Sequence, residues 1–282
     1  MGNKLCCTNK INVASDKIPN LIEKHYFNIA DYNPVFLGNG LSGNTYKITI
    51  NGILFTCKKI NKKYEPDVWD EILVLKSIKH DNYLPNFYKC IKFDNHFNIL
   101  YKYIDGVELF EMIVNGNLLE SDTPIIIKEV TLALNALFKY NYIHLDIKPE
   151  NILIVRRNPI KLKLIDLGFC KKINESNNLT KTRGTVGYIS PEVCLYNRFF
   201  HNTDVWSLGI IFNILLTGKN IFSDDSFIQE INEFTKLDDS CLLEDETCFD
   251  ILNKMLTKNP AFRISIVGVL EHGYLQRVSP II

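Results

Sequence analysis

The stretch from Tyr142 to Glu192 constrains this chain more than any other part of its sequence. It places two carboxylates and one amide, those of Asp146, Asp166 and Asn151, within one predicted loop and hairpin. Such a set can hold Mg²⁺ ions and accept a proton from a hydroxyl group. The alternative interpretation treats these side chains as unrelated turn residues.

Three short motifs within this stretch carry a family resemblance. Residues 142–151 read Tyr-Ile-His-Leu-Asp-Ile-Lys-Pro-Glu-Asn, residues 166–168 read Asp-Leu-Gly, and residues 184–192 read Gly-Thr-Val-Gly-Tyr-Ile-Ser-Pro-Glu. They resemble the catalytic loop, the metal-binding segment and the activation segment of eukaryotic protein kinases. All three occur in the family's order and at its spacing, so unrelated turns are a poor explanation.

Composition narrows the class of protein further. The 282 residues are 46% apolar and 23% charged with zero net charge, which is ordinary for a globular protein and favours no nucleic acid partner. The eight cysteines show no Cys-x-x-Cys pair, which favours free thiols in a reducing compartment. No apolar run reaches the roughly 18–20 residues of a membrane span. We therefore expect a cytoplasmic monomer.

The N-terminal tail, residues 1–30, raises the question of lipidation. Gly2 follows the initiator methionine, as in an N-myristoylation acceptor, and the adjacent Cys6 and Cys7 are candidates for palmitate. The pattern prefers Ser or Thr where this chain has Cys6, so the match is partial. Two acyl chains would attach the protein to the cytoplasmic face of a membrane. A disordered tail with incidental cysteines is the alternative.

The resemblance implies an α+β, bilobal protein-kinase fold over residues 31–282. Residues 31–104 would form a small β-rich lobe with one main helix, and residues 105–282 a larger and mostly helical lobe. Strands are predicted where β-branched and aromatic residues gather, at 35–37, 45–50, 53–60, 97–104 and 161–165. Apolar residues at helical spacing predict helices over 69–79 and 125–142.

The turn between the first two predicted strands has the pattern G-x-G-x-x-G, formed by Gly38, Gly40 and Gly43. Glycines here would let backbone N–H groups approach phosphate oxygens with no Cβ in the way. The motif alone is weak, and a plain hairpin turn is at least as consistent with it. A strand follows it instead of a helix, which suits the kinase glycine-rich loop and argues against a dinucleotide-binding crossover.

The resemblance implies that this loop belongs to an ATP site. Lys58 would grip the α- and β-phosphates, and Glu71 would pair with it from the following helix. Lys59 should face the other side of its strand, because side chains alternate. A solvated surface charge is the alternative interpretation for both Lys58 and Glu71.

Further residues would hold the adenosine part of the nucleotide. By resemblance, the backbone of Lys102 and Ile104 would bind the edge of adenine, and Glu108 would contact the ribose. Relatives usually place Val and Ala above the adenine ring, where this chain has Thr45 and Thr56. A buried hydroxyl needs a hydrogen-bond partner, so we expect weaker nucleotide binding. Implied nucleotide contacts are Thr45, Thr56, Lys102, Ile104, Glu108 and Leu153.

The catalytic roles follow from the same resemblance. Asp146 would act as the base for the attacking hydroxyl, and Lys148 would stabilise the transferring phosphoryl group. Asn151 and Asp166 would hold Mg²⁺. Lys148 stands two residues after the aspartate, as in the serine/threonine branch of the family. His144 is expected to hold the loop and not to be catalytic.

Several other positions are implied to be architectural. Thr185 should bond toward Asp146 and Lys148 as part of the platform for a Ser/Thr acceptor. Asp204 should support the backbone of the catalytic loop, and a buried ion pair should join Glu192 and Arg263. These assignments, too, come from the resemblance.

Leu145 is the clearest departure from the family pattern. Most relatives have arginine there, which reads a phosphate on the activation segment through paired hydrogen bonds. Leucine cannot do this. We therefore expect activity that does not depend on phosphorylation of Ser176, Thr180 or Thr182.

Lys58, Glu71, Asp146, Asn151 and Asp166 fill every catalytic position of the pattern. The resulting expectation is an enzyme that moves the γ-phosphoryl group of Mg-ATP to Ser/Thr hydroxyls of proteins. Its large-lobe motifs are most similar to calcium/calmodulin-kinase-like members, although we expect no calmodulin-binding tail. A pseudokinase that binds nucleotide or acts as a scaffold is the alternative, motivated by Leu145, Thr45 and Thr56. The peptide platform at 184–192 disfavours a small-molecule kinase.

Overall fold

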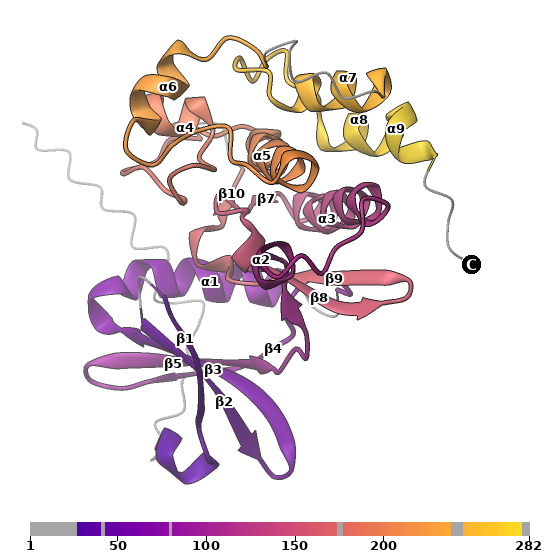
Figure 1. The fold of residues 1–282 in the computed structure, drawn as a ribbon. Coiled ribbons are helices and arrows are strands. Elements are labelled where there is room, and N and C mark those ends of the chain that lie inside the picture. Colours follow the sequence, from indigo (N-terminus) through magenta and orange to yellow (C-terminus); the bar gives the residue numbers. More distant parts are fainter. Residues whose placement is uncertain (1–26, 41–42, 79–80, 174–176, 238–244, 278–282) are drawn as a thin grey trace, which may run out of the picture. The chain divides into compact units, whose positions relative to one another are not determined.

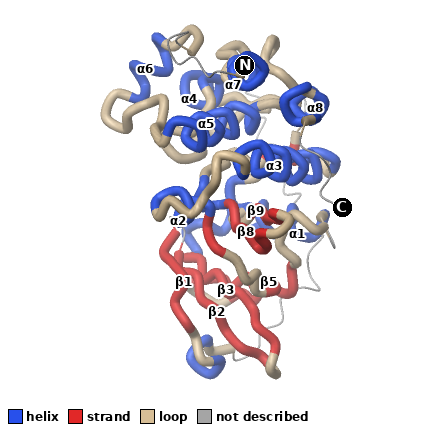
Figure 2. The backbone as a smooth tube through the Cα atoms, turned by 45° about the vertical axis from the view of Figure 1, so that its right-hand side comes forward, coloured by secondary structure: helices blue, strands red, loops and turns tan. Residues whose placement is uncertain are grey.

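The computed structural model describes residues 27–40, 43–78, 81–173, 177–237 and 245–277. The described chain forms two compact units (Figure 1). The first comprises residues 27–69 and 88–101, and the second residues 70–87 and 102–277. Strands dominate the first unit and helices the second (Figure 2), which confirms the predicted α+β class.

The first unit is built on a five-stranded sheet with the order β1-β2-β3-β5-β4. Alternating β-branched and aromatic residues let its strands pack on the pleated surface of the sheet. β1 extends three residues beyond its predicted end, β2 begins two residues earlier than expected, and β3 ends one residue later. β5 begins one residue earlier and ends two residues earlier than expected, before residues 103–106, which belong to no strand. The strands are β1 (Val35–Gly40), β2 (Gly43–Ile50), β3 (Ile53–Asn61), β4 (Phe87–Lys92) and β5 (His96–Lys102).

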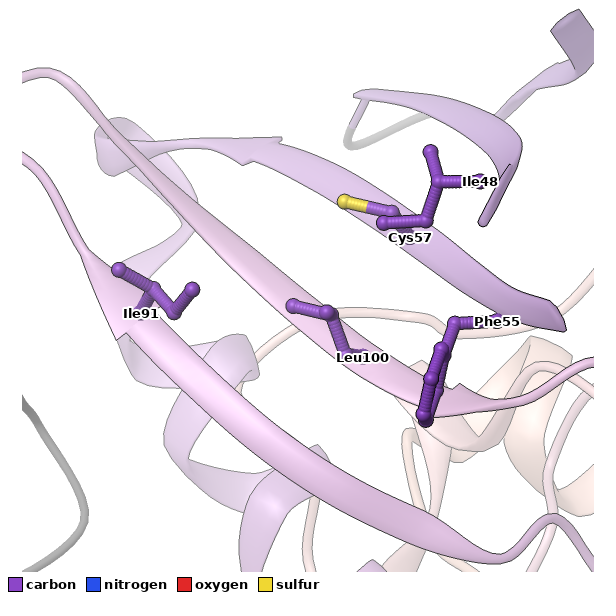
Figure 3. Close-up of a cluster of buried hydrophobic side chains, with 5 residues drawn as sticks. All are labelled: Ile48, Phe55, Cys57, Ile91 and Leu100. Atoms are coloured by element: carbon purple, nitrogen blue, oxygen red, sulfur yellow. The ribbon is translucent and has the colours of Figure 1, made fainter. Parts of the chain in front are cut away.

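One face of this sheet carries an apolar core (Figure 3). Its fully buried members include Ile48 and Cys57, and each buried Ile or Leu side chain stabilises the fold by roughly 1.5–3 kcal/mol. The segment that precedes β1 packs against the same cluster through Phe27, Ile29 and Tyr32. The cluster consists of Ile48, Phe55, Cys57, Ile91 and Leu100.

Helix α1 (Glu65–Ser77) begins four residues before the predicted start. The first turn, Glu-Pro-Asp, has no apolar periodicity, so the pattern missed it. It nevertheless carries general start signals, because proline fits the first turn of a helix and acidic side chains complement the positive end of the helix dipole. Val68, Ile72 and Leu75 form its buried stripe, each at most 2% exposed.

The second unit contains the helices α2 to α9 and two small sheets. One sheet has the order β6-β8-β9, and the other pairs β7 with β10. The strands are β6 (Val107–Glu108), β7 (Tyr142–Ile143), β8 (Ile152–Arg157), β9 (Ile160–Leu164) and β10 (Lys171–Lys172). The helices are α2 (Leu109–Val114), α3 (Asp122–Lys139), α4 (Pro191–Tyr196), α5 (Thr203–Thr217), α6 (Phe227–Glu233), α7 (Glu246–Met255), α8 (Ile266–Glu271) and α9 (Gly273–Gln276).

Helix α3 ends three residues earlier than expected. Asn141 adopts a left-handed conformation (φ 61°), and its N–H donates to the carbonyl of Phe138 at 2.8 Å. Asparagine tolerates this conformation better than most residues, so it ends the helix. Tyr142 therefore starts β7 and leads directly into the predicted catalytic loop.

A buried ion pair joins α4 to the segment before α8, as predicted. Arg263 donates to both carboxylate oxygens of Glu192, at 2.7 and 2.8 Å. The hydroxyl of Thr203 donates to the same carboxylate at 2.9 Å. The guanidinium also lies over the ring of Trp206, 5.2 Å from its centroid. The side chains of the pair are 0% and 3% exposed, so neither charge has water as a substitute partner.

Replacing one partner of this pair should destabilise the second unit severely. Arg263→Met keeps much of the volume but leaves the Glu192 carboxylate buried and unpaired, which should cost roughly 3–5 kcal/mol. Urea denaturation followed by circular dichroism measures this loss. Lys254→Met is the matched control, because its ion pair with Asp250 is half exposed and should contribute less than about 1 kcal/mol. Equal stability of the two variants would contradict the assignment.

Candidate active site

The hairpin of β8 and β9 brings the predicted metal-binding residues together. Ile152 pairs with Leu164, so the residue before β8 and the residues after β9 lie at the same end of the hairpin. The N–H of Ile165 donates to the carbonyl of Asn151 at 2.9 Å. Asn151 and Asp166 are therefore neighbours, although they are far apart in sequence.

Asp146 lies at the centre of the polar contacts in this loop and is 5% exposed. Its carboxylate accepts hydrogen bonds from the Thr185 hydroxyl at 2.7 Å and from the Asn151 amide at 3.0 Å. The Lys148 ammonium lies 3.7 Å from the carboxylate and donates to the Thr185 hydroxyl at 2.9 Å. The predicted contacts of Thr185 are thus confirmed. They fix the direction in which the carboxylate of Asp146 points.

Asp204, at the start of α5, holds the backbone of this loop through hydrogen bonds. Its two carboxylate oxygens accept the N–H groups of His144 at 2.7 Å and of Leu145 at 2.9 Å. Burial raises the pKa of Asp204, while His144 and these N–H groups oppose the rise. Leu145 has a left-handed backbone (φ 66°), and the two hydrogen bonds hold it in this unfavourable conformation.

The imidazole of His144 is fully buried and has a structural role, as expected. One ring nitrogen lies 3.2 Å from the carbonyl of Ile165, and the other accepts the N–H of Asp146 at 3.3 Å. The ring thereby connects the catalytic loop with the residue before Asp166.

The donor set fits a magnesium ion. The amide nitrogen of Asn151 donates to the Asp146 carbonyl at 2.8 Å as well as to its carboxylate, which leaves the amide oxygen for another partner. Asp166 has a left-handed backbone (φ 56°) and accepts the N–H of Gly168 at 3.2 Å. No group of three or more His, Cys, Asp or Glu side chains suited to a metal occurs among the described residues. Magnesium needs none, because it keeps several waters and binds through one or two carboxylates and substrate phosphates.

The glycine-rich turn belongs to the first unit. Gly38 pairs with Thr45, and Gly40 with Gly43, while Leu41 and Ser42 lie outside the described residues. A Cβ at Gly43 would lie 1.8 Å from the carbonyl oxygen of Lys59. Gly43 is therefore required by the packing of β2 on β3, a reason that differs from the predicted approach to phosphate.

Lys58 and the two threonines also lie in the first unit. Thr45 pairs with Lys58 across β2 and β3. Thr56 and Lys58 are 7% and 5% exposed, whereas Lys59 is exposed, in agreement with the predicted alternation. Glu71, 3% exposed on α1, belongs to the second unit. The pairing of Lys58 with Glu71 stays a prediction.

The remaining predicted nucleotide contacts lie in the second unit. Glu108 pairs with Leu153 across β6 and β8, so these two residues lie side by side. The N–H of Lys102 donates to the carbonyl of Asn86 at 3.0 Å, so this N–H is not available to adenine. Burial and the nearby carboxylates of Glu111 and Glu150 raise the pKa of Glu108. The adenine contact of Ile104 stays a prediction.

Some predictions fall outside the described residues or are not tested. Gly2, Cys6, Cys7 and Ser176 lie in segments that the structure does not describe. Acylation and the monomeric state therefore stay predictions. The cysteines in the described part of the chain form no disulfide bonds. Among the described helices, none is long and apolar enough to cross a membrane.

The contacts that anchor the activation segment were not predicted from the sequence. Leu179 donates its N–H to the carbonyl of Asn197 at 2.8 Å, and Thr182 donates its hydroxyl to the Asn197 side chain at 2.8 Å. Lys171 forms an ion pair with Asp70 of α1. These partners lie 15 or more residues apart in sequence. No periodicity or short motif signals such long-range pairs.

Comparison with known proteins agrees with this geometry. Residues 33–275 match the family described as "Protein kinase domain". The chain therefore belongs to the protein kinase family, whose members in general use ATP and a divalent metal ion.

Its relatives include myosin light chain kinases. The chain is 32% identical to human "Myosin light chain kinase family member 4" over 85% of its own length and 64% of the relative. It is 32% identical to mouse "Myosin light chain kinase 2, skeletal/cardiac muscle" over 86% of its length and 41% of the relative. The chain thus spans less than two thirds of these proteins.

Removing the Asp204 carboxylate should loosen the catalytic loop. Hydrogen bonds to a charged acceptor contribute about 1.5–3 kcal/mol each, so Asp204→Ala should speed exchange of the His144 and Leu145 amide protons at least tenfold. Hydrogen exchange read by mass spectrometry measures this effect. Asp204→Asn keeps one acceptor oxygen, so its exchange rates should lie between those of the wild type and of Asp204→Ala. Asp225→Ala, at an exposed position, should change nothing. Unchanged protection in Asp204→Ala would refute this role.

Proposed function

We propose that this protein is an ATP-dependent kinase that transfers the γ-phosphoryl group of Mg-ATP to Ser and Thr hydroxyls of proteins. The observation that carries the proposal is the carboxylate of Asp146, oriented by Thr185 and Asn151 with Lys148 beside it. A carboxylate so held is suited to accept a proton from an attacking hydroxyl. Family membership and the similarity to proteins named as kinases support the same activity.

The proposed reaction assigns one task to each residue. The acceptor hydroxyl oxygen forms a bond to the γ-phosphorus, the bond to the bridging oxygen breaks, and its electron pair leaves with ADP. The hydroxyl proton goes to Asp146. Lys148 places positive charge beside the transferring group. Asn151 and Asp166 would hold magnesium, which supplies charge neutralisation for the phosphates when bound.

The charges of the second unit favour a basic protein substrate. Glu108, Glu111 and Glu150 lie close enough for the latter two to raise the pKa of Glu108. A group of carboxylates near the catalytic loop attracts cationic side chains of a substrate. We therefore propose acceptor sites with arginine or lysine upstream of the Ser or Thr. Ile214 stands where many basic-directed relatives are acidic, so the preference should be moderate.

The pseudokinase alternative rests on Thr45, Thr56 and Leu145. Thr56 is 7% exposed, so its hydroxyl is largely removed from water. Against this alternative, all five residues that perform the chemistry in the family are present. Transfer of phosphate discriminates between the two functions directly.

Replacing the metal-binding carboxylate should abolish transfer. We expect the wild-type chain to move labelled γ-phosphate from Mg-ATP to a basic protein such as histone, and Asp166→Asn to be at least about 10²-fold slower, equivalent to about 2.7 kcal/mol of transition-state stabilisation. Asp225→Asn is the control. A folded wild type that transfers nothing to several substrates would favour the pseudokinase.

We further propose that the activation segment from residue 177 to Glu192 is ordered without phosphorylation. Leu145 is 6% exposed and cannot bind a phosphate. Its carbonyl oxygen would lie 2.7 Å from a Cβ at Gly184, so the catalytic loop and the activation segment meet backbone to backbone. Asn178 and Arg198 form an isolated β-bridge, and Thr182 bonds to Asn197 through its unmodified hydroxyl. These contacts can supply the order that a phosphate supplies in relatives.

A chain without the candidate phosphorylation sites should therefore stay active. We expect the triple variant of Ser176→Ala, Thr180→Ala and Thr182→Ala to keep kcat within about threefold of the wild type, since the hydrogen bond of Thr182 that is lost contributes only about 1 kcal/mol. Thr185→Ala, from the same segment, should lose activity and serves as the control. Loss of activity in the triple variant would overturn the proposal.

A further inference from the structure

Helix α1 presents two polar side chains on one face to the small sheet of β7 and β10. Asp70 and Ser77 are seven residues apart, which is about two turns, so they share a face. Asp70 pairs with Lys171 of β10, and the Ser77 hydroxyl lies 3.4 Å from the hydroxyl of Tyr142 in β7. The helix is therefore tied to both strands.

The two strands lie next to the catalytic elements. In their pairing, Lys171 is opposite Ile143, the residue before His144. β10 itself begins three residues after Gly168, at the end of the metal-binding segment. Both strands thus extend directly from the segments that carry Asp146 and Asp166. A side chain that ties α1 to β10 also ties it to these segments.

Glu71 directly follows Asp70 on α1. Its carboxyl group is buried, and the position of its backbone depends on where the helix lies. The Asp70–Lys171 ion pair acts one residue away from Glu71 and five residues after Asp166. The ion pair thus connects the part of α1 that carries Glu71 with the metal-binding segment, and the proposed reaction needs these two stretches in fixed positions.

We infer that Lys171 is a positioning residue: through its ion pair with Asp70 it holds α1, and with it Glu71, in a fixed position relative to the metal-binding segment. The inference rests on the proposed function for its catalytic consequence. A lysine–aspartate pair needs no modifying enzyme. It would fix the helix permanently in a chain whose Leu145 cannot respond to a phosphate.

The chain offers a matched control on the same strand. Lys172 follows Lys171, is exposed, and makes no ion pair with any residue that the structure describes. Lys171→Met and Lys172→Met remove the same charge from adjacent positions. Any difference between them reports the contact with Asp70 and not the net charge of the protein.

Steady-state kinetics of the full chain tests the catalytic consequence. The side chains of Lys171 and Asp70 are 26% and 36% exposed, so solvent screens their ion pair. We therefore expect Lys171→Met to lower kcat about fivefold, which corresponds to the upper end of the free energy that such pairs contribute. Lys172→Met should match the wild type. Lys171→Arg should keep activity, and combining Asp70→Lys with Lys171→Asp should restore most of it. Equal kcat for the two methionine variants, or a swapped pair no better than its single variants, would overturn the inference.

Hydrogen exchange over residues 70–77 separates this inference from the proposed function. Lys171→Met should speed exchange of these amides relative to Lys172→Met, whether or not the protein transfers phosphate. If the wild type is inactive but α1 loosens only in Lys171→Met, the proposed function fails and the positioning role stands. If transfer occurs and exchange is the same in both variants, Lys171 does not position the helix.

Discussion

The buried carboxylate of Asp204 is the interaction on which the site depends. It accepts two N–H groups of the catalytic loop, at residues 144 and 145, and so holds Leu145 in a left-handed conformation. That turn directs the next residue, Asp146, toward Thr185 and Asn151. Burying a charge without partners is costly, and the hydrogen bonds offset much of this cost. The geometry of Asp146 is thus supplied by α5, a helix that contributes no reacting group.

Two kinds of order meet at this loop. The hairpin of β8 and β9 places Asn151 beside Ile165 through strand register, which backbone hydrogen bonds determine. The orientation of Asp146 comes instead from side chains of the activation segment and of α5. Register tolerates many side-chain substitutions, whereas a network of buried polar groups tolerates few, because each lost partner leaves another group unsatisfied. Changes in Thr185 or Asp204 should therefore affect the site more than changes within the hairpin strands.

Local motifs predicted most of the catalytic loop, because Asp146 contacts Lys148, Asn151 and Thr185, which all lie within the three short motifs. The contacts of Thr185 and Asp204 and the Glu192–Arg263 pair all followed from resemblance. Periodicity missed the first turn of α1, where Glu65 and Pro66 carry start signals but no apolar stripe. It could not reveal the pairs of Asp70 with Lys171 or of Thr182 with Asn197, since neither charge nor hydroxyl identifies a partner far away in sequence.

The replacement of arginine by Leu145 changes how the activation segment is held. An arginine that binds a phosphate makes order depend on modification, because without the phosphate a buried guanidinium would itself lack a partner. Leucine removes that cost, and Gly184 lies so close to the catalytic loop that an added Cβ would be 2.7 Å from the Leu145 carbonyl oxygen. Backbone pairing at Asn178 and Arg198 is independent of any charge change. The hydrogen bond of Thr182 and the bridge of Asn178 with Arg198 hold the segment without a phosphate. Control of such a kinase would have to act elsewhere, through access of its substrates or through the helix that carries Glu71.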